Sequence, residues 1–155
     1  MTASSRSFYL DRLRVVLTAL VILHHTAITY GGSGGWFYRE VPSSSSPTSL
    51  LLTLFCAVNQ SFFMVMFFLL AGYFTPGSLQ RKGLAPFIQE RLIRLGLPLL
   101  LFGFVLGPLT VALAIWLKNQ NLLQRWLSQL EQGSFVIGPL WFVFALLIFS
   151  LAYVA

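Results

Sequence analysis

Arg14 and His25 are the two residues of this sequence whose types and spacing best suit chemistry. They bound the stretch RVVLTALVILHH, which lies in a segment apolar enough to enter a bilayer. Eleven residues of α-helix turn through about 1,100°, so both side chains fall within about 20° of one face, about 16 Å apart along the axis. An ionisable group within a membrane span is costly and by default faces the protein interior. Because a guanidinium binds phosphate and a neutral imidazole accepts a proton near pH 7, the pair predicts an anion site with a base deeper in the membrane.

Arg91 and Arg94 form a second basic pair, three residues apart and therefore neighbours on one helix face. If Arg14 lies on the same side of the membrane, the three arginines suit a polyanionic ligand. An alternative stays open, in which the arginines only anchor helix ends at the cytosolic interface. In the same alternative His25 only hydrogen-bonds another helix, and for His24 we expect no more than such a bond or an interfacial position.

The elements that position these residues are predicted to be membrane helices. Hydrophobic residues make up 57% of the 155 residues and charged residues 9%, against roughly a quarter charged in a soluble domain. This composition predicts an all-α integral membrane protein. Its predicted partner is the lipid bilayer. Four apolar stretches are long enough to cross or nearly cross about 30 Å of hydrocarbon, namely residues 15–30, 50–74, 95–117 and 136–155. Segment 120–131 has leucines and a tryptophan at helical spacing, which predicts a helix lying flat in the outer interface.

The charge distribution predicts how these spans are oriented. The net charge is +6, but the basic residues sit at span ends without clusters of exposed aromatics, which argues against nucleic-acid binding. Positive residues favour the cytosolic side, so the N-terminus and the second loop are expected inside and the other two loops outside. None of the four acidic residues lies in the middle of a span, which disfavours a proton pump built on an intramembrane carboxylate.

Glycine and proline predict the breaks between and within these helices. The first loop is rich in glycine and serine and is expected to be mobile, and its Trp36, with the two aromatic residues that follow, is interpreted as an interfacial anchor. Pro76 and Gly77 predict a turn after the second span. In the third span, Pro98 and Pro108 predict a kink or break whose freed carbonyls are satisfied by neighbouring helices or a cavity.

Four stretches, in order, resemble the acyltransferase 3 family of membrane O-acyltransferases. YLDRLRVVLTALVILHH is similar to the first helix of that family, whose signature is an arginine, ten intervening residues and a histidine; Arg14 and His25 fit this spacing. FFLLAGYF resembles the family's FFxLSGY/F pattern, and RLIRLGLPLL its arginine-x-x-arginine stretch followed by proline. GPLWFVFALL is similar to the G-x-L-W-F segment that opens its fourth helix.

The resemblance implies transfer of an acyl group, usually acetyl, from cytosolic acyl-coenzyme A to a hydroxyl of a surface or periplasmic carbohydrate. It implies that His25 acts as general base, that Arg14, Arg91 and Arg94 attract or hold the anionic donor, and that no metal or tightly bound cofactor is needed. Members have about ten spans in what is expected to be the bacterial inner membrane. Residues 1–155 are therefore expected to be the N-terminal part of such a bundle, a fragment or truncated product that is inactive alone.

Two other functions are weighed against this one. A small four-helix transporter acting as an oligomer would explain the kinked third span, but the missing intramembrane carboxylate weighs against it. Haem ligation by His24 or His25 would need a second chain, because adjacent histidines on a helix point about 100° apart. The acceptor, the acyl group and the oligomeric state are not determined by the sequence.

Overall fold

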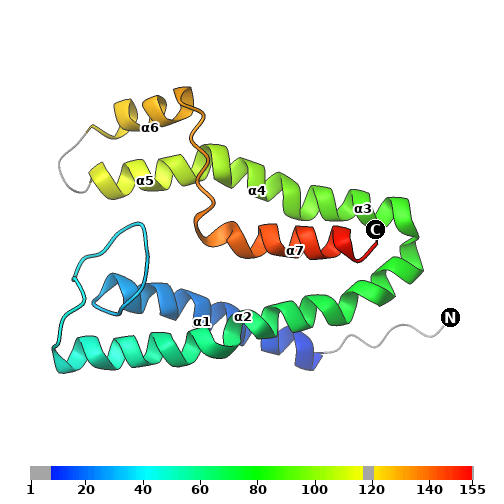
Figure 1. Ribbon diagram of the computed structural model, residues 1–155, viewed down its shortest axis with the longest axis horizontal. Coiled ribbons are helices and arrows are strands. Elements are labelled where there is room, and N and C mark those ends of the chain that lie inside the picture. Colours follow the sequence, from blue (N-terminus) through cyan, green and yellow to red (C-terminus); the bar gives the residue numbers. More distant parts are fainter. Residues whose placement is uncertain (1–7, 117–120, 155) are drawn as a thin grey trace. The chain divides into compact units, whose positions relative to one another are not determined.

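The computed structural model describes residues 8–116 and 121–154. The regular elements of this part of the chain are helices, joined by non-helical segments, with an isolated bridge between Tyr30 and Val41, and the predicted all-α class is confirmed. Its α-helices, labelled in Figure 1, are α1 (Phe8–Thr29), α2 (Pro47–Lys82), α3 (Leu84–Arg91), α4 (Leu97–Leu101), α5 (Gly107–Trp116), α6 (Leu122–Glu131) and α7 (Trp141–Ala152). The π-helical segments η1 (Leu92–Gly96) and η2 (Phe102–Leu106) join α3, α4 and α5, and the 3₁₀ turn η3 (Gly138–Leu140) precedes α7.

Three stretches of the described residues are long and apolar enough to cross a membrane, namely Phe8–Thr29, Pro47–Lys82 and Leu84–Ile115. They contain most of the first three predicted spans. The fourth predicted span, residues 136–155, is not confirmed: its helix runs only from Gly138 to Ala152, about 22 Å against about 30 Å of hydrocarbon. The backbone N–H of Val136 donates to the Gly103 carbonyl at 2.9 Å, so the chain here pairs with η2 instead of continuing the helix.

The chain forms two compact units, Met1–Leu70 and Ala71–Ala155. In the first, α1 packs against the N-terminal part of α2, and Asn59 Nδ2 donates across the pair to the Leu20 carbonyl at 3.0 Å. Two buried apolar clusters hold the helices together, one formed by Leu17, Phe63 and Leu70 and the other by Ala27, Ile28 and Cys56. The apolar face of α1 therefore points at α2 and fixes which side chains lie on its flank.

The connection between α1 and α2 folds back on the ends of these helices. Ser49 Oγ donates to the Gly31 carbonyl at 2.5 Å, and the Glu40 N–H donates to the Thr29 carbonyl at 3.0 Å. The loop that was expected to be mobile is thus tied to both helices by hydrogen bonds. Within it, the Tyr38 hydroxyl donates to the Glu40 carboxylate, and this bond raises the pKa of Tyr38 above its ordinary value.

Threonine hydroxyls on α1 are paired within the helix itself. Thr18, Thr26 and Thr29 each donate to the carbonyl four residues earlier, at 2.9, 2.9 and 3.0 Å. A hydroxyl without a partner is costly in an apolar environment, and this back-bonding removes that cost without a second helix.

The predicted turn at Pro76 and Gly77 is wrong, because α2 continues through both residues to Lys82. Proline removes one backbone hydrogen bond, a loss that membrane helices tolerate when nearby groups satisfy the freed carbonyls. The chain turns instead at Gly83, whose φ of 78° lies in the left-handed region where a side chain is strained.

In the second unit, Pro98 and Pro108 each follow a π-helical segment. The residues just before them, Leu97 and Gly107, donate their N–H groups to carbonyls five residues back rather than four. The helix is not broken at either proline, but it widens to π-helical turns just before each one, and a kink there stays a prediction. The Gly103 carbonyl, five residues before Pro108 and so left without that donor, accepts from the Val136 N–H at 2.9 Å.

Two helices cover this interrupted helix. α7 lies along α3 and η1, and α6 lies along α5 (Figure 1). The backbone at Gly103 lies directly against the Phe135 ring. A Cβ placed on Gly103 would be only 2.1 Å from that ring. The predicted interfacial helix 120–131 corresponds to α6, with residue 120 outside the described residues; its position at an interface stays a prediction.

Candidate functional site

The His25 side chain is fixed by a bond to its own helix. Its Nδ1 lies 2.8 Å from the Val21 carbonyl oxygen, and the side chain is partly buried. A carbonyl oxygen can only accept, so in the neutral imidazole this contact assigns the hydrogen to Nδ1. Nε2 then carries the free lone pair. In this tautomer the proton-accepting atom of the ring is not used by the helix.

Trp36 lies against His25, with the two ring centroids 3.9 Å apart and the planes inclined by 41°. The loop between α1 and α2 brings the indole there, where it also packs on the buried cluster that contains Ile28. Trp36 is thus a contact of the candidate base, a role that its interpretation as an interfacial anchor had missed. Sequence spacing gave no signal for this contact, because the loop conformation decides it.

His24 is the more deeply buried histidine, with 7% of its surface exposed. Its ring centroid lies 5.3 Å from that of Phe63 and 5.5 Å from that of His25. Its Nδ1 has no hydrogen-bond partner within the described residues, and neither does the buried Asn59 Oδ1. Of the two alternatives expected for His24, an interhelical side-chain bond is not seen among the described residues; its backbone carbonyl accepts from Cys56 Sγ at 3.8 Å.

Arg14 lies on the same uninterrupted helix as His25, so the predicted common face is kept. Relative to the buried Leu17, the two positions lie about 60° and 80° around the helix, on the flank of the face that packs against α2. Arg14 is exposed and pairs with Asp11 at 3.5 Å. The helix does not bring Arg14 and His25 together, because eleven residues still separate them by about 16 Å.

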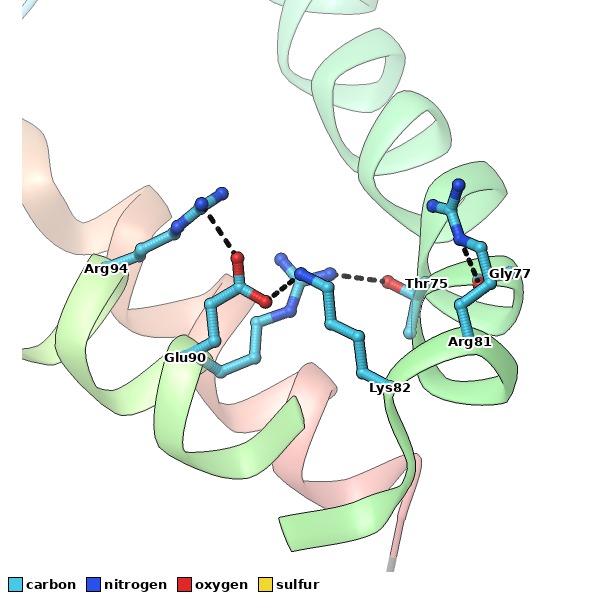
Figure 2. A network of polar contacts seen from close by, with 7 residues as sticks. Thr75, Gly77, Arg81, Lys82, Glu90 and Arg94 are labelled. Atoms are coloured by element: carbon cyan, nitrogen blue, oxygen red, sulfur yellow. Dashed lines mark hydrogen bonds and ion pairs between the residues drawn. The ribbon is translucent and has the colours of Figure 1, made fainter. Parts of the chain in front are cut away.

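Arg91 and Arg94 lie in what we call the basic cluster, formed by Lys82, Glu90, Arg91 and Arg94 near Thr75 (Figure 2). Arg94 Nη2 contacts Glu90 Oε1 at 2.8 Å, and Lys82 Nζ pairs with the other oxygen of this carboxylate. Arg91 Nη2 donates to Thr75 Oγ1 at 3.3 Å, and its guanidinium carbon lies 5.0 Å from the centre of the Phe87 ring. Two cations therefore pair with one carboxylate while Arg91, the next residue along the chain, keeps its charge unpaired by an acid in these contacts, an excess of positive charge that suits anion binding.

Lys82 was not singled out in the sequence, since it is nine residues from Arg91 and the predicted turn lay elsewhere. Arg14 belongs to the first unit of the chain and the basic cluster to the second. Convergence of Arg14 with Arg91 and Arg94 on one ligand therefore stays a prediction. Among the described residues, no group of three or more His, Cys, Asp or Glu side chains forms a metal-binding set.

Comparison with known families decides what these features belong to. The model of the acyltransferase 3 family, described as an acyltransferase domain, matches residues 7–155. The chain belongs to the acyltransferase 3 family. The match includes Arg14, His25 and the basic cluster, so the resemblance inferred from the four sequence stretches is confirmed. Family and apolar helices together indicate an integral membrane protein.

Named relatives agree with this membership. Glucans biosynthesis protein C of Escherichia coli (strain K12 / DH10B) is 34% identical over 97 residues, which cover 63% of this chain and 24% of that protein. The protein of the same name from Shigella boydii serotype 4 (strain Sb227) is 33% identical over 97 residues, which again cover 63% of this chain and 24% of that protein. The chain thus spans about a quarter of the length of these relatives. No solved structure matches it.

The transporter alternative is not favoured. It required four spans, and the C-terminal apolar helix, Gly138–Ala152, is shorter than the three that are long enough to cross a membrane. The family match over residues 7–155 points to an acyltransferase domain instead.

Proposed function

We propose that this protein is part of a membrane O-acyltransferase that moves an acyl group, preferably acetyl, from cytosolic acyl-coenzyme A to a hydroxyl of a surface or periplasmic carbohydrate. The observation that carries the proposal is His25, whose Nδ1 is bonded to the Val21 carbonyl while Nε2 keeps its lone pair. Support for a carbohydrate acceptor comes from the relatives, whose name refers to the biosynthesis of glucans. The bacterial inner membrane, with a cytosolic N-terminus, is the proposed location.

In the proposed reaction His25 Nε2 takes the proton of the acceptor hydroxyl as its oxygen attacks the thioester carbonyl. The carbon–sulfur bond then breaks, and the imidazolium returns the proton to the leaving thiolate. The Nδ1–H stays bonded to Val21 O throughout, so the ring keeps its orientation. An ester and free coenzyme A are formed, and the histidine ends in its starting state.

Arg14, Arg91 and Arg94 are proposed to hold the phosphates of the donor at the cytosolic edge. Arginine suits this role because its planar donors match phosphate oxygens. Arg14 and His25 are about 16 Å apart along α1, and the flexible pantetheine arm of coenzyme A can bridge such a separation. The donor would then bind at one membrane edge and react near the other.

The proposal is tested by measuring acyl transfer with the protein expressed from its natural coding frame. Proteoliposomes would receive labelled acetyl-coenzyme A and a glucan acceptor, and label in the glucan would be counted. We expect His25→Gln to lower kcat by about 10²- to 10⁴-fold, as is typical on loss of a general base. Arg14→Gln should raise the KM for acetyl-coenzyme A, whereas Arg12→Gln, on another face of α1, should not. Full activity of inserted His25→Gln protein would refute the role of histidine.

A further inference from the structure

Lys82 has no part in the function proposed so far. Its Nζ pairs with one oxygen of the Glu90 carboxylate, and Arg94 Nη2 contacts the other oxygen at 2.8 Å (Figure 2). The left-handed Gly83 joins the end of α2 to the start of α3 and so brings Lys82 next to Glu90. A third cation thereby stands beside the arginine pair.

The three cations differ in how firmly they are held. Arg91 is bonded to Thr75 and stacked on Phe87, neither of which is charged. Lys82 and Arg94 are held only by Glu90 in the contacts described, with side chains 39% and 75% exposed. Solvent screens such exposed ion pairs, so they add little stability and exchange partners at low cost.

A phosphate group is a stronger partner for these cations than the carboxylate. It carries more charge and more acceptor oxygens, and arginine can bind it through two donors at once. An arriving phosphate therefore competes with Glu90 for Lys82 and Arg94, while Arg91 offers a cation already in place.

We propose that Lys82 is a donor-binding residue, and that Glu90 is an internal anion that the phosphates of acyl-coenzyme A displace from Lys82 and Arg94. The inference rests on the proposed function and extends it with two residues. Coenzyme A carries a diphosphate and a separate phosphate, enough to engage several cations together. Headgroups of anionic lipids offer the same phosphate chemistry with a net negative charge, and the experiment separates these lipids from coenzyme A.

Binding of coenzyme A itself tests the inference without any need for catalysis. The protein from its natural coding frame would be placed in phosphatidylcholine nanodiscs and titrated by calorimetry. We expect Lys82→Gln to weaken binding about tenfold and Lys82→Arg to restore most of it, because charge-assisted bonds to phosphate are among the strong ones. Arg81→Gln is the matched control, since Arg81 donates to the Gly77 carbonyl at 3.0 Å and points away from Glu90 in Figure 2; it should change binding less than about twofold.

Glu90→Gln gives the sharper result. If Glu90 competes with the donor, its neutralisation should tighten coenzyme A binding by about threefold or more; a merely structural carboxylate would leave binding unchanged or weaken it. Equal effects of Lys82→Gln and Arg81→Gln would also overturn the inference.

Nanodiscs containing phosphatidylglycerol test the lipid source. Disappearance of the Lys82 effect there would show that lipid phosphate occupies the cluster and would overturn the inference. Failure of the wild-type protein to bind coenzyme A at all would remove the donor from the proposed function too. If the wild-type protein binds coenzyme A and Lys82→Gln binds it equally well, this inference alone is refuted.

Discussion

The His25 imidazole is held on two sides, by the Val21 carbonyl at Nδ1 and by the Trp36 indole, whose ring centroid lies 3.9 Å away. The first contact fixes which nitrogen is free, and the second limits rotation of the ring. Together they define the direction in which Nε2 points. A base of this kind works only when it lies within hydrogen-bond reach of the proton it accepts.

Replacement of Trp36 should therefore affect the chemical step more than substrate binding. We expect Trp36→Ala to lower kcat about tenfold or more, with little change in KM for acetyl-coenzyme A, because small losses of orientation are costly. Trp36→Phe keeps a ring and should retain most activity. Initial rates over a range of donor concentrations would measure both constants. A change confined to KM would instead place Trp36 in donor binding.

Asn59 is expected to tolerate an apolar replacement better than a charged one. Asn59→Leu removes the bond to Leu20 O but also removes a buried oxygen without a partner, so its cost should be below about 1 kcal/mol. Asn59→Asp keeps the shape, loses the donor and buries a carboxyl, and should cost several kcal/mol. Thermal unfolding in detergent, followed by circular dichroism, would compare the two; equal melting temperatures would contradict this account.

Gly103 should not accept a larger side chain. A Cβ there would meet the Phe135 ring at 2.1 Å, so Gly103→Ala is expected to destabilise the second unit by about 1–3 kcal/mol through overpacking. Gly72→Ala is the control, because a Cβ at Gly72 meets nothing within 4 Å. Adding Phe135→Leu to Gly103→Ala should recover part of the loss. Additive effects in this double-mutant cycle would show that the two positions do not interact.

The Tyr38–Glu40 bond predicts a pH effect outside the spans. Because the bond holds the proton on Tyr38 and raises its pKa, its contribution to loop stability is present below the ordinary tyrosine pKa. It is lost as the pH rises through the raised value. Glu40→Gln should lower the pKa of Tyr38, seen as the difference in tyrosinate absorbance between each protein and its Tyr38→Phe variant. An unchanged titration would exclude the bond in solution.

The sequence was sufficient for features that depend on local spacing. The common face of Arg14 and His25 follows from helical periodicity, and the irregularity at Pro98 and Pro108 follows from a missing donor. The prediction misplaced the turn after α2, because a proline can either end a membrane helix or lie within it. Pro76 lies within α2, and the helix ends at Lys82, just before the left-handed Gly83.

Contacts that depend on the path of a loop were not predictable from spacing. Trp36 reaches His25 only because the first loop folds back on α1, and Lys82 reaches Glu90 only because the chain reverses after it. The start of the fourth predicted span differs for a similar reason. Val136 is apolar enough for a membrane helix, but its backbone N–H donates to the Gly103 carbonyl in η2.

The hydroxyl bonds within α1 bear on how this protein is made. Thr18, Thr26 and Thr29 pair with carbonyls of their own helix, and His25 does the same through Nδ1. Whatever the order in which the helices enter the bilayer, α1 can do so with these donors already satisfied. These hydroxyls and the His25 Nδ1–H thus impose little penalty on membrane insertion of the helix.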